Sequence, residues 1–320
     1  MTDSMGQNGP RSPVPASVPD TVVSIGSFDG VHLGHQRLLR DAVDQARRRG
    51  WRAVAVTFEP LPAQVLRPDR FVGRICGAGE KLSLIRSCGV DDVQVLRFSP
   101  TFAQQSPEAF MASLVSSTGL HELWVGEGFA LGKDRAGDIS YLRTIGEDLA
   151  FDVVAISRLT FDGSVVSSSS IRRTVMTGDV VEAARSLGRP FRVAGTVIHG
   201  AHLGRTIGFP TANVPPPPDQ VPLADGIYAS WATIDGEVPR RPAMTYVGTR
   251  PTVNTGQRLV ETHLLDFAGD LYGQRLIVDV VERLRADESF PSVEAMVDQL
   301  HLDELAARRT LQTIGASTLP

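Results

Sequence analysis

Residues 21–35 read TVVSIGSFDGVHLGH, a β-branched run that leads through a glycine-containing turn into a helical pattern. The run from Thr21 to Ile25 predicts a strand, and the apolar spacing over residues 35–49 predicts a helix that stops at Gly50. Glycines at such a junction let the backbone turn tightly and come close to a ligand. Residues 26–35, named the histidine loop, therefore predict a ligand site at a strand–helix junction.

Alternating strands and helices continue to about residue 187. Further strands are expected at residues 53–58, 93–98, 123–125 and 153–156, with a helix at 80–86. This alternation favours a parallel sheet with helices on both faces, in which ligands bind beyond the carboxyl ends of the strands. We assign residues 21–187 to an N-terminal α/β domain.

The pattern changes near Gly188, where strand-like runs follow one another with few helices between them. They cover residues 192–198, 227–233, 243–247, 259–265 and 276–284, and a helix is expected over 292–312. Short strands between turns rich in Gly, Pro and Asp are typical of antiparallel barrels or sandwiches. We assign residues 188–320 to a mainly antiparallel β-barrel domain with a terminal helix. The apolar residues of that helix fit inward packing or a subunit contact, so a homo-oligomer stays open.

Composition excludes several classes of protein. The chain has 320 residues, and its 42% hydrophobic content is too high for a disordered protein. A formal net charge of −4 gives no general attraction to nucleic acid or anionic lipid. No apolar run reaches the roughly 18 residues of a membrane span. Cys76 and Cys88 match no zinc or redox spacing and favour a reducing compartment. We expect a cytoplasmic protein with a disordered leader over residues 1–20 and no nucleic-acid or membrane partner.

Two motifs suggest phosphate chemistry. In the histidine loop, His32 and His35 stand at the start of a helix, whose N–H groups and dipole suit an anion such as a nucleotide triphosphate. The alternative is that a histidine there only caps the helix or lies at the surface. The second motif, GAHLGRTIGFPTAN at residues 200–213, is named the glycine loop. Its glycines are spaced to wrap phosphates and its hard oxygen donors suit Mg²⁺, although a glycine-rich barrel turn is the alternative.

Further motifs follow along the chain: Phe58-Glu59-Pro60, Glu80-Lys81-Leu82, Val125-Gly126, residues 132–138, residues 167–172, Asp225-Gly226-Ile227-Tyr228, residues 248–252, residues 260–267 and residues 269–273. Together with the histidine loop and the glycine loop, this ordered set resembles the bifunctional riboflavin kinase/FAD synthetase family of bacteria over nearly the whole chain after the leader. The resemblance implies a nucleotidyltransferase-like, Rossmann-like N-terminal domain.

For the N-terminal domain, the resemblance implies transfer of AMP from ATP to FMN, which makes FAD and releases pyrophosphate. His32, His35 and Arg172 would then be catalytic contacts to the phosphates. The nucleotide-binding residues would be Gly26, Phe28, Asp29, Gly30, Ser167, Ser168 and Ser169. Taken alone, the serine run also fits a flexible polar loop.

For the C-terminal domain, the resemblance implies phosphorylation of riboflavin to FMN with Mg-ATP. Glu261 would be the general base on the flavin hydroxyl, and Thr211 and Asn213 would serve the metal. Gly200, Gly204, Gly208 and Thr211 would bind the nucleotide. A surface glutamate on an edge strand is the alternative for Glu261.

Leu61 and Gly128 depart from the family pattern, which usually has a histidine and an Asn or Asp there. They motivate an alternative, a paralogue with an active riboflavin or flavin-analogue kinase and a weak or redirected nucleotidyltransferase half. A non-catalytic flavin-binding regulator is a second alternative.

We predict that Glu261→Gln lowers kinase turnover at least about tenfold, because one positioned base typically contributes about 10²–10⁴-fold. The glutamine side chain has nearly the same shape as that of glutamate, so the fold and ATP binding should be unchanged. FMN formation under saturating substrates measures the effect. Turnover above about a tenth of the unaltered protein's would contradict the assigned role.

Overall fold

The computed structural model describes residues 19–200, 203–235, 237, 239–249 and 258–315. The first 18 residues of the predicted leader lie outside this range. Among the described residues, no helix has both the length and the apolar character required to cross a bilayer.

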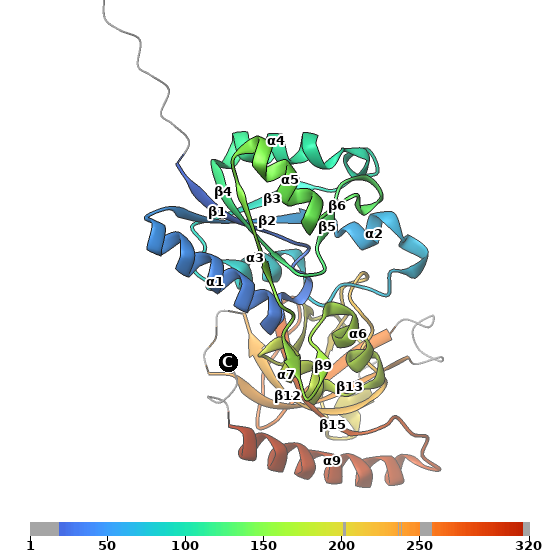
Figure 1. Ribbon diagram of the computed structural model, residues 1–320. Coiled ribbons are helices and arrows are strands. Elements are labelled where there is room, and N and C mark those ends of the chain that lie inside the picture. Colours follow the sequence, from blue (N-terminus) through green and yellow to red (C-terminus); the bar gives the residue numbers. More distant parts are fainter. Residues whose placement is uncertain (1–18, 201–202, 236, 238, 250–257, 316–320) are drawn as a thin grey trace, which may run out of the picture.

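The N-terminal part is a five-stranded parallel sheet covered on both faces (Figure 1). Its order is β3 (Asp92–Arg97), β2 (Arg52–Glu59), β1 (Thr21–Ile25), β4 (Leu120–Gly126) and β7 (Asp152–Ile156). Helices α1 (Leu33–Arg49) and α3 (Ala78–Ser87) cover one face, and α4 (Pro107–Thr118) and α5 (Ile139–Leu149) cover the other. The predicted α/β class is confirmed, and all five expected strands are present.

Short elements complete this part of the chain. They are α2 (Pro62–Leu66), the hairpin of β5 (Ala130–Leu131) with β6 (Gly137–Asp138), the hairpin of β8 (Thr160–Phe161) with β9 (Ser164–Val165), and single 3₁₀ turns at 29–31, 68–70, 102–104 and 133–135.

The C-terminal part is an antiparallel six-stranded sheet that curls into a nearly closed barrel. Its order is β10 (Phe191–Thr196), β15 (Arg275–Arg285), β12 (Gly226–Ile234), β13 (Arg241–Thr249), β14 (Arg258–Leu264) and β11 (Ala212–Val214). A bridge between Ile198 and Asn213 joins the two edges. The four-residue helix α8 (Leu203–Thr206) precedes β11. The predicted barrel is confirmed.

The predicted terminal helix is α9 (Val293–Ile314), which lies across the outside of the barrel (Figure 1). Ala307 and Leu311 are buried against the sheet, so part of its apolar surface packs inward. Leu302 and Leu305 remain 58% and 57% exposed.

Helices α6 (Ser168–Thr177) and α7 (Val180–Leu187) belong to the range assigned to the first domain, but they pack on the barrel (Figure 1). Ile171, Val175 and Leu187 join the hydrophobic core that the barrel strands enclose. The barrel thus carries the last two helices that precede it in the sequence.

A backbone bridge joins the two parts at Arg74 and Gln220. The Arg74 N–H donates to the Asp219 carbonyl at 2.7 Å, and the Val221 N–H donates to the Arg74 carbonyl at 2.9 Å. The two backbone segments come so close that a Cβ on Gly73 would lie 2.4 Å from the Val221 nitrogen, and Gly73 has φ +116°. Only glycine fits this position without displacing one domain from the other.

Gly73→Ala should therefore destabilise the protein by roughly 1–3 kcal/mol, through backbone strain and loss of the bridge. Gly77→Ala is the matched control, since no atom lies within 4 Å of a Cβ there. Thermal unfolding followed by circular dichroism compares the two. Equal melting temperatures would show that the close approach at Gly73 does not constrain the domains.

Candidate functional site

The histidine loop follows β1 directly, at the carboxyl edge of the parallel sheet. β1 lies at the centre of the sheet, between β2 and β4. The chain adds β2 and β3 on one side of β1 and then crosses over to add β4 and β7 on the other side. In open α/β sheets, such a switch point creates the crevice in which ligands bind. The sheet topology therefore places the loop where the sequence analysis expected a ligand.

The backbone of the histidine loop is unusual. Phe28, Gly30 and Val31 have φ values of 47°, 76° and 39°, and a β-branched residue such as valine rarely adopts positive φ. A Cβ on Gly30 would come within 2.9 Å of the Ile75 side chain. Such strain persists only where the surroundings enforce it, and it concentrates at functional sites.

The two histidine rings stack, with centroids 3.6 Å apart. His32 is only 6% exposed, and its Nδ1 accepts the His35 N–H at 3.3 Å, so it also caps α1. Burial lowers the pKa of His32 to about 4, and burial also lowers the pKa of His35. Both rings are therefore neutral at neutral pH, and they can act on a phosphate as hydrogen-bond donors rather than as cations.

Asp29 and Arg172, both expected beside the nucleotide, form an ion pair with each other. The Asp29 carboxylate is 2% exposed and accepts the Ile75 N–H at 3.0 Å, and burial raises its pKa. Arg172 also donates to the Gly73 carbonyl at 2.6 Å. The carboxylate thus holds the loop in place.

The serine run begins helix α6. Ser167 caps the helix by accepting the Ser170 N–H at 3.1 Å, and the Ser170 hydroxyl accepts the Ser167 N–H in return. The Ser168 hydroxyl donates to the Asp29 carbonyl at 3.0 Å, while Ser169 is exposed. The interpretation as a flexible loop is wrong: these residues form a capped helix start that contacts the histidine loop.

The remaining predicted residues of this site are Gly26 and Phe28. The Gly26 N–H donates to the Val56 carbonyl at 3.0 Å, which continues the pairing of β1 with β2. Phe28 is 1% exposed and packs edge-on against His35, with ring centroids 5.3 Å apart. Its side chain supports the loop from the core.

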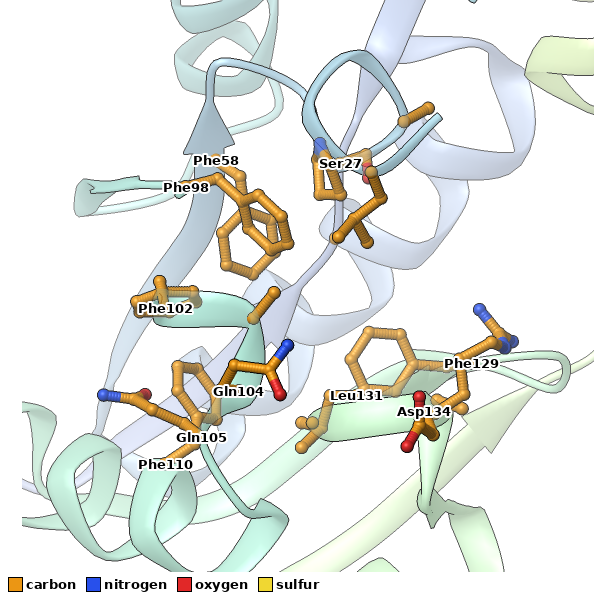
Figure 2. Close-up of a pocket in the computed structure, with 18 of the residues that line it drawn as sticks. Ser27, Phe58, Phe98, Phe102, Gln104, Gln105, Phe110, Phe129, Leu131 and Asp134 are labelled. Carbon is orange, nitrogen blue, oxygen red and sulfur yellow. The ribbon is translucent and has the colours of Figure 1, made fainter. Parts of the chain in front are cut away.

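An aromatic cavity of about 790 Å³ opens beside the histidine loop (Figure 2). Gly26 and Ser27 form part of its wall, so the cavity and the loop are continuous. Five phenylalanines line it: Phe58, Phe98, Phe102, Phe110 and Phe129. Gln104, Gln105, Asp134 and Arg135 supply polar groups around the apolar surface. This composition suits a flat aromatic ligand with polar edges.

The aromatic cavity has no signature in the sequence, because its phenylalanines are scattered over more than 70 residues and form no local motif. Gly128 and Leu61, the two residues that depart from the family pattern, lie differently with respect to this cavity. Gly128 lies in the cavity wall, and its carbonyl accepts from Arg135 at 3.1 Å. Leu61 is 2% exposed and does not line the cavity, although Pro62 and Ala63, which follow it, do.

In the barrel, β11 and β14 bring the second group of predicted residues together. Asn213 pairs directly opposite Glu261, and the Thr211 hydroxyl donates to the Glu261 carboxylate at 3.5 Å. Glu261 is 8% exposed, and β14 lies between β13 and β11. The interpretation as a surface glutamate on an edge strand is therefore wrong.

The glycines of the glycine loop allow close approaches. A Cβ on Gly200 would lie 2.4 Å from the Asn213 amide, and one on Gly204 would lie 2.2 Å from the Phe209 carbonyl. Gly208 has φ +87°. The backbone here is folded tightly around the residues that face Glu261.

No cluster of three His, Cys, Asp or Glu residues suited to a metal ion occurs in the described parts of the chain. Thr211, Asn213 and Glu261 nevertheless place a hydroxyl, an amide and a carboxylate together. This oxygen set fits Mg²⁺, which retains several waters and needs only one or two protein ligands.

Comparisons with known proteins cover both domains. Family models match for FAD synthetase over residues 14–170 and for riboflavin kinase over residues 187–311. The bifunctional riboflavin kinase/FMN adenylyltransferase of Escherichia coli (strain K12) is 38% identical over 90% of this chain and 91% of that protein. The protein of the same name from Pseudomonas fluorescens is 39% identical over 90% and 92%.

A solved structure described as a macrolide-efflux protein from Streptococcus pneumoniae also matches. It aligns with a TM-score of 0.83 at 31% identity, over 92% of this chain and 95% of that one. The similarity extends through both domains, so the complete two-domain arrangement is shared.

Burial of His32 predicts a pH effect on stability. The unfolded chain takes up a proton on this ring near pH 6.5 and the folded chain only near pH 4, so acidification between these values favours unfolding. Lowering the pH from about 7 to about 5 should cost about 2 kcal/mol through this group, and His32→Gln should remove that part of the loss.

Denaturant unfolding at the two pH values measures the effect. His121→Gln is the control, because that exposed histidine pairs with Asp20 away from the loop. If His32→Gln loses as much unfolding free energy between the two pH values as the unaltered protein does, the buried neutral state of His32 is contradicted.

Proposed function

The chain belongs to the bifunctional riboflavin kinase/FMN adenylyltransferase family, and we propose that it catalyses both reactions. The barrel domain phosphorylates riboflavin to FMN with Mg-ATP, and the α/β domain adenylylates FMN to FAD with ATP. The domain limits 21–187 and 188–320 remain part of this proposal.

The observation that carries the adenylyl-transfer assignment is the continuity of the aromatic cavity with the histidine loop. The flat ring of FMN would stack among the phenylalanines, with its edge facing the polar groups of Gln104 and Gln105. Its phosphate would then point toward the start of α1. Gly26 and Ser27, which border both spaces, lie where the flavin and ATP meet.

Chemically, an oxygen of the FMN phosphate attacks the α-phosphorus of ATP and forms a new P–O bond. The bond from that phosphorus to the oxygen bridging to the β-phosphate breaks, and pyrophosphate leaves. The nucleophile is already an anion, so no protein base is required. The neutral rings of His32 and His35, with the N–H groups that begin α1 and α6, donate to phosphate oxygens as negative charge develops.

The ligand contacts of this half divide into two kinds. We assign His32, His35 and Ser169 to direct contact with the phosphates. We assign Asp29, Arg172, Ser167 and Ser168 to a structural role, because the polar side-chain group of each already bonds to another part of the protein.

For the kinase half, we assign Glu261 as the base that accepts the proton of the riboflavin 5′-hydroxyl. The deprotonated 5′-oxygen attacks the γ-phosphorus of ATP, the bond from that phosphorus to the bridging oxygen breaks, and ADP leaves. Thr211 and Asn213 would hold Mg²⁺, which when bound neutralises phosphate charge. The close-packed glycine loop would bring backbone N–H groups near the same phosphates.

The paralogue with a redirected N-terminal half remains the second candidate, because Gly128 lies in the cavity wall. Leu61 is buried directly before the wall residues Pro62 and Ala63, so it does not itself face the ligand space. A cytoplasmic location, the absence of nucleic-acid partners and a homo-oligomer stay predictions.

The proposal is tested by incubating the purified chain with riboflavin, ATP and Mg²⁺, and separating riboflavin, FMN and FAD by chromatography with fluorescence detection. We expect FMN to appear first and FAD to follow. FMN without FAD would support the kinase and contradict the adenylyl-transfer assignment. Neither product would contradict both and leave the regulator as the better explanation.

A further inference from the structure

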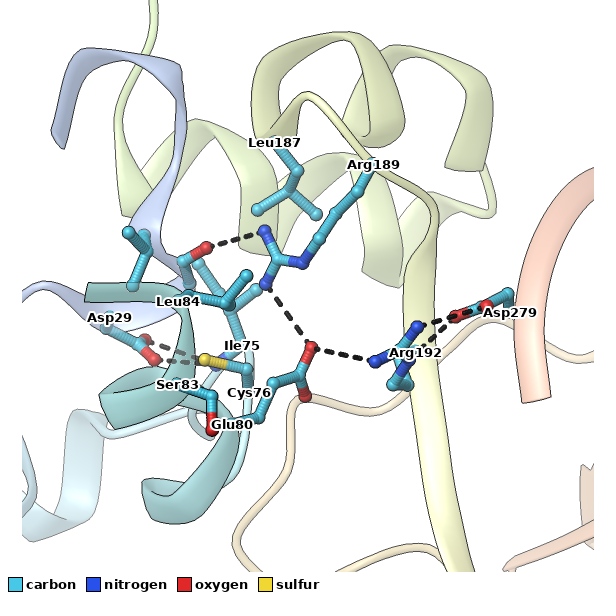
Figure 3. A network of polar contacts seen from close by, with 12 residues as sticks. Asp29, Ile75, Cys76, Glu80, Ser83, Leu84, Leu187, Arg189, Arg192 and Asp279 are labelled. Atoms are coloured by element: carbon cyan, nitrogen blue, oxygen red, sulfur yellow. Dashed lines mark hydrogen bonds and ion pairs between the residues drawn. The ribbon is translucent and has the colours of Figure 1, made fainter. Parts of the chain in front are cut away.

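Arg189 lies in the short connection between α7 and β10, far in sequence from the histidine loop, yet its side chain contacts that loop (Figure 3). Its Nη1 donates to the Gly30 carbonyl at 2.9 Å, and its Nη2 lies 3.5 Å from the Glu80 carboxylate. The side chain is only 11% exposed. A buried arginine with these two partners holds a fixed position.

The contacts continue into the barrel. Glu80 of α3 lies 4.0 Å from Arg192 of β10, and Arg192 donates to both oxygens of Asp279 at 2.7 and 3.1 Å (Figure 3). Asp279 is buried in β15, 1% exposed. A chain of charged groups thus runs from β15 of the barrel, through β10 and α3, to the loop.

A second contact ties the same loop to the same connection. The Gln36 side-chain amide donates to the Val31 carbonyl and to the Leu187 carbonyl, both at 3.0 Å. Gly30 and Val31 are two of the three loop residues with positive φ, and for the β-branched Val31 this conformation is unfavourable. The Gly30 carbonyl is therefore held by Arg189 of the domain connection, and the Val31 carbonyl by Gln36 of α1, which also donates to the connection at Leu187.

Arg189 also acts through its charge. It lies close enough to His32 to disfavour protonation of that ring, in addition to the effect of burial. The guanidinium thus adds positive potential behind the surface that would face the phosphates of ATP, without itself lining the aromatic cavity.

We infer that Arg189 is a positioning residue for adenylyl transfer, which holds the Gly30 carbonyl so that the histidine loop fits the phosphates of ATP. The inference rests on the proposed function of the N-terminal domain. It means that the barrel domain, besides carrying the kinase site, sets the geometry of the other site.

The test compares Arg189→Met, which keeps the aliphatic length without donors or charge, with Arg189→Lys, which keeps the charge and one donor group. Arg185→Met is the matched control: this arginine of α7 is 50% exposed and pairs with Asp162, not with the histidine loop. For each protein, kcat and the KM for ATP are measured for FAD formation from FMN. Riboflavin phosphorylation by the same sample reports on folding of the whole chain.

Arg189→Met should lower kcat/KM for FAD formation by about ten- to a hundredfold, with a raised KM for ATP, because misplaced groups around a reacting phosphate cost this much. Riboflavin phosphorylation should stay within about twofold, and Arg189→Lys should recover part of the loss. The rise in KM matters, since a partly unfolded sample loses kcat and keeps its KM.

Three results would overturn the inference. One is unchanged FAD formation in Arg189→Met. Another is an equal loss in Arg185→Met. The third is a parallel loss of both activities with an unchanged KM for ATP, which would show general destabilisation. Failure of the unaltered protein to form FAD would instead overturn the proposed function, and the inference with it.

Discussion

One buried carboxylate holds together three segments that are distant in the sequence. The Asp29 carboxylate accepts the Ile75 N–H and pairs with Arg172 of α6. The backbone carbonyl of Asp29 accepts the Ser168 hydroxyl. A carboxylate with 2% exposure is costly to bury unless such partners satisfy it. Asp29 therefore links the histidine loop to residues 73–75, which lead to the barrel, and to the start of α6.

This arrangement makes the N-terminal site a joint product of both domains. The histidine loop grows from the parallel sheet, but helix α6, which contacts it, is packed into the barrel core through Ile171 and Val175. The bridge between Arg74 and Gln220 fixes the same junction from the other side. A relative shift of the domains would change the distance between the two walls of the site.

The two proposed reactions use different groups, and the burial of each fits its task. His32 is buried and His35 half-buried, and burial lowers the pKa of both rings, so both are neutral, which suits donation to phosphates when the nucleophile already carries charge. Glu261 faces a hydroxyl and an amide on neighbouring positions, which suits a base beside a metal-bound phosphate. The described residues assigned to one site are all different from those assigned to the other, so each site can be altered while the other reports on folding.

Sequence patterns alone predicted both fold classes, the expected strands of the sheet and barrel, and the two motifs that lie at strand ends. Local apolar periodicity and glycine spacing are recorded in neighbouring residues, which is why these features could be predicted. The sequence patterns did not reveal the aromatic cavity, the Asp29–Arg172 pair or the attachment of α6 and α7 to the barrel. These depend on which distant side chains meet once the sheet and barrel have packed, and only the tertiary structure decides that because burial and ion pairing act across space rather than along the chain.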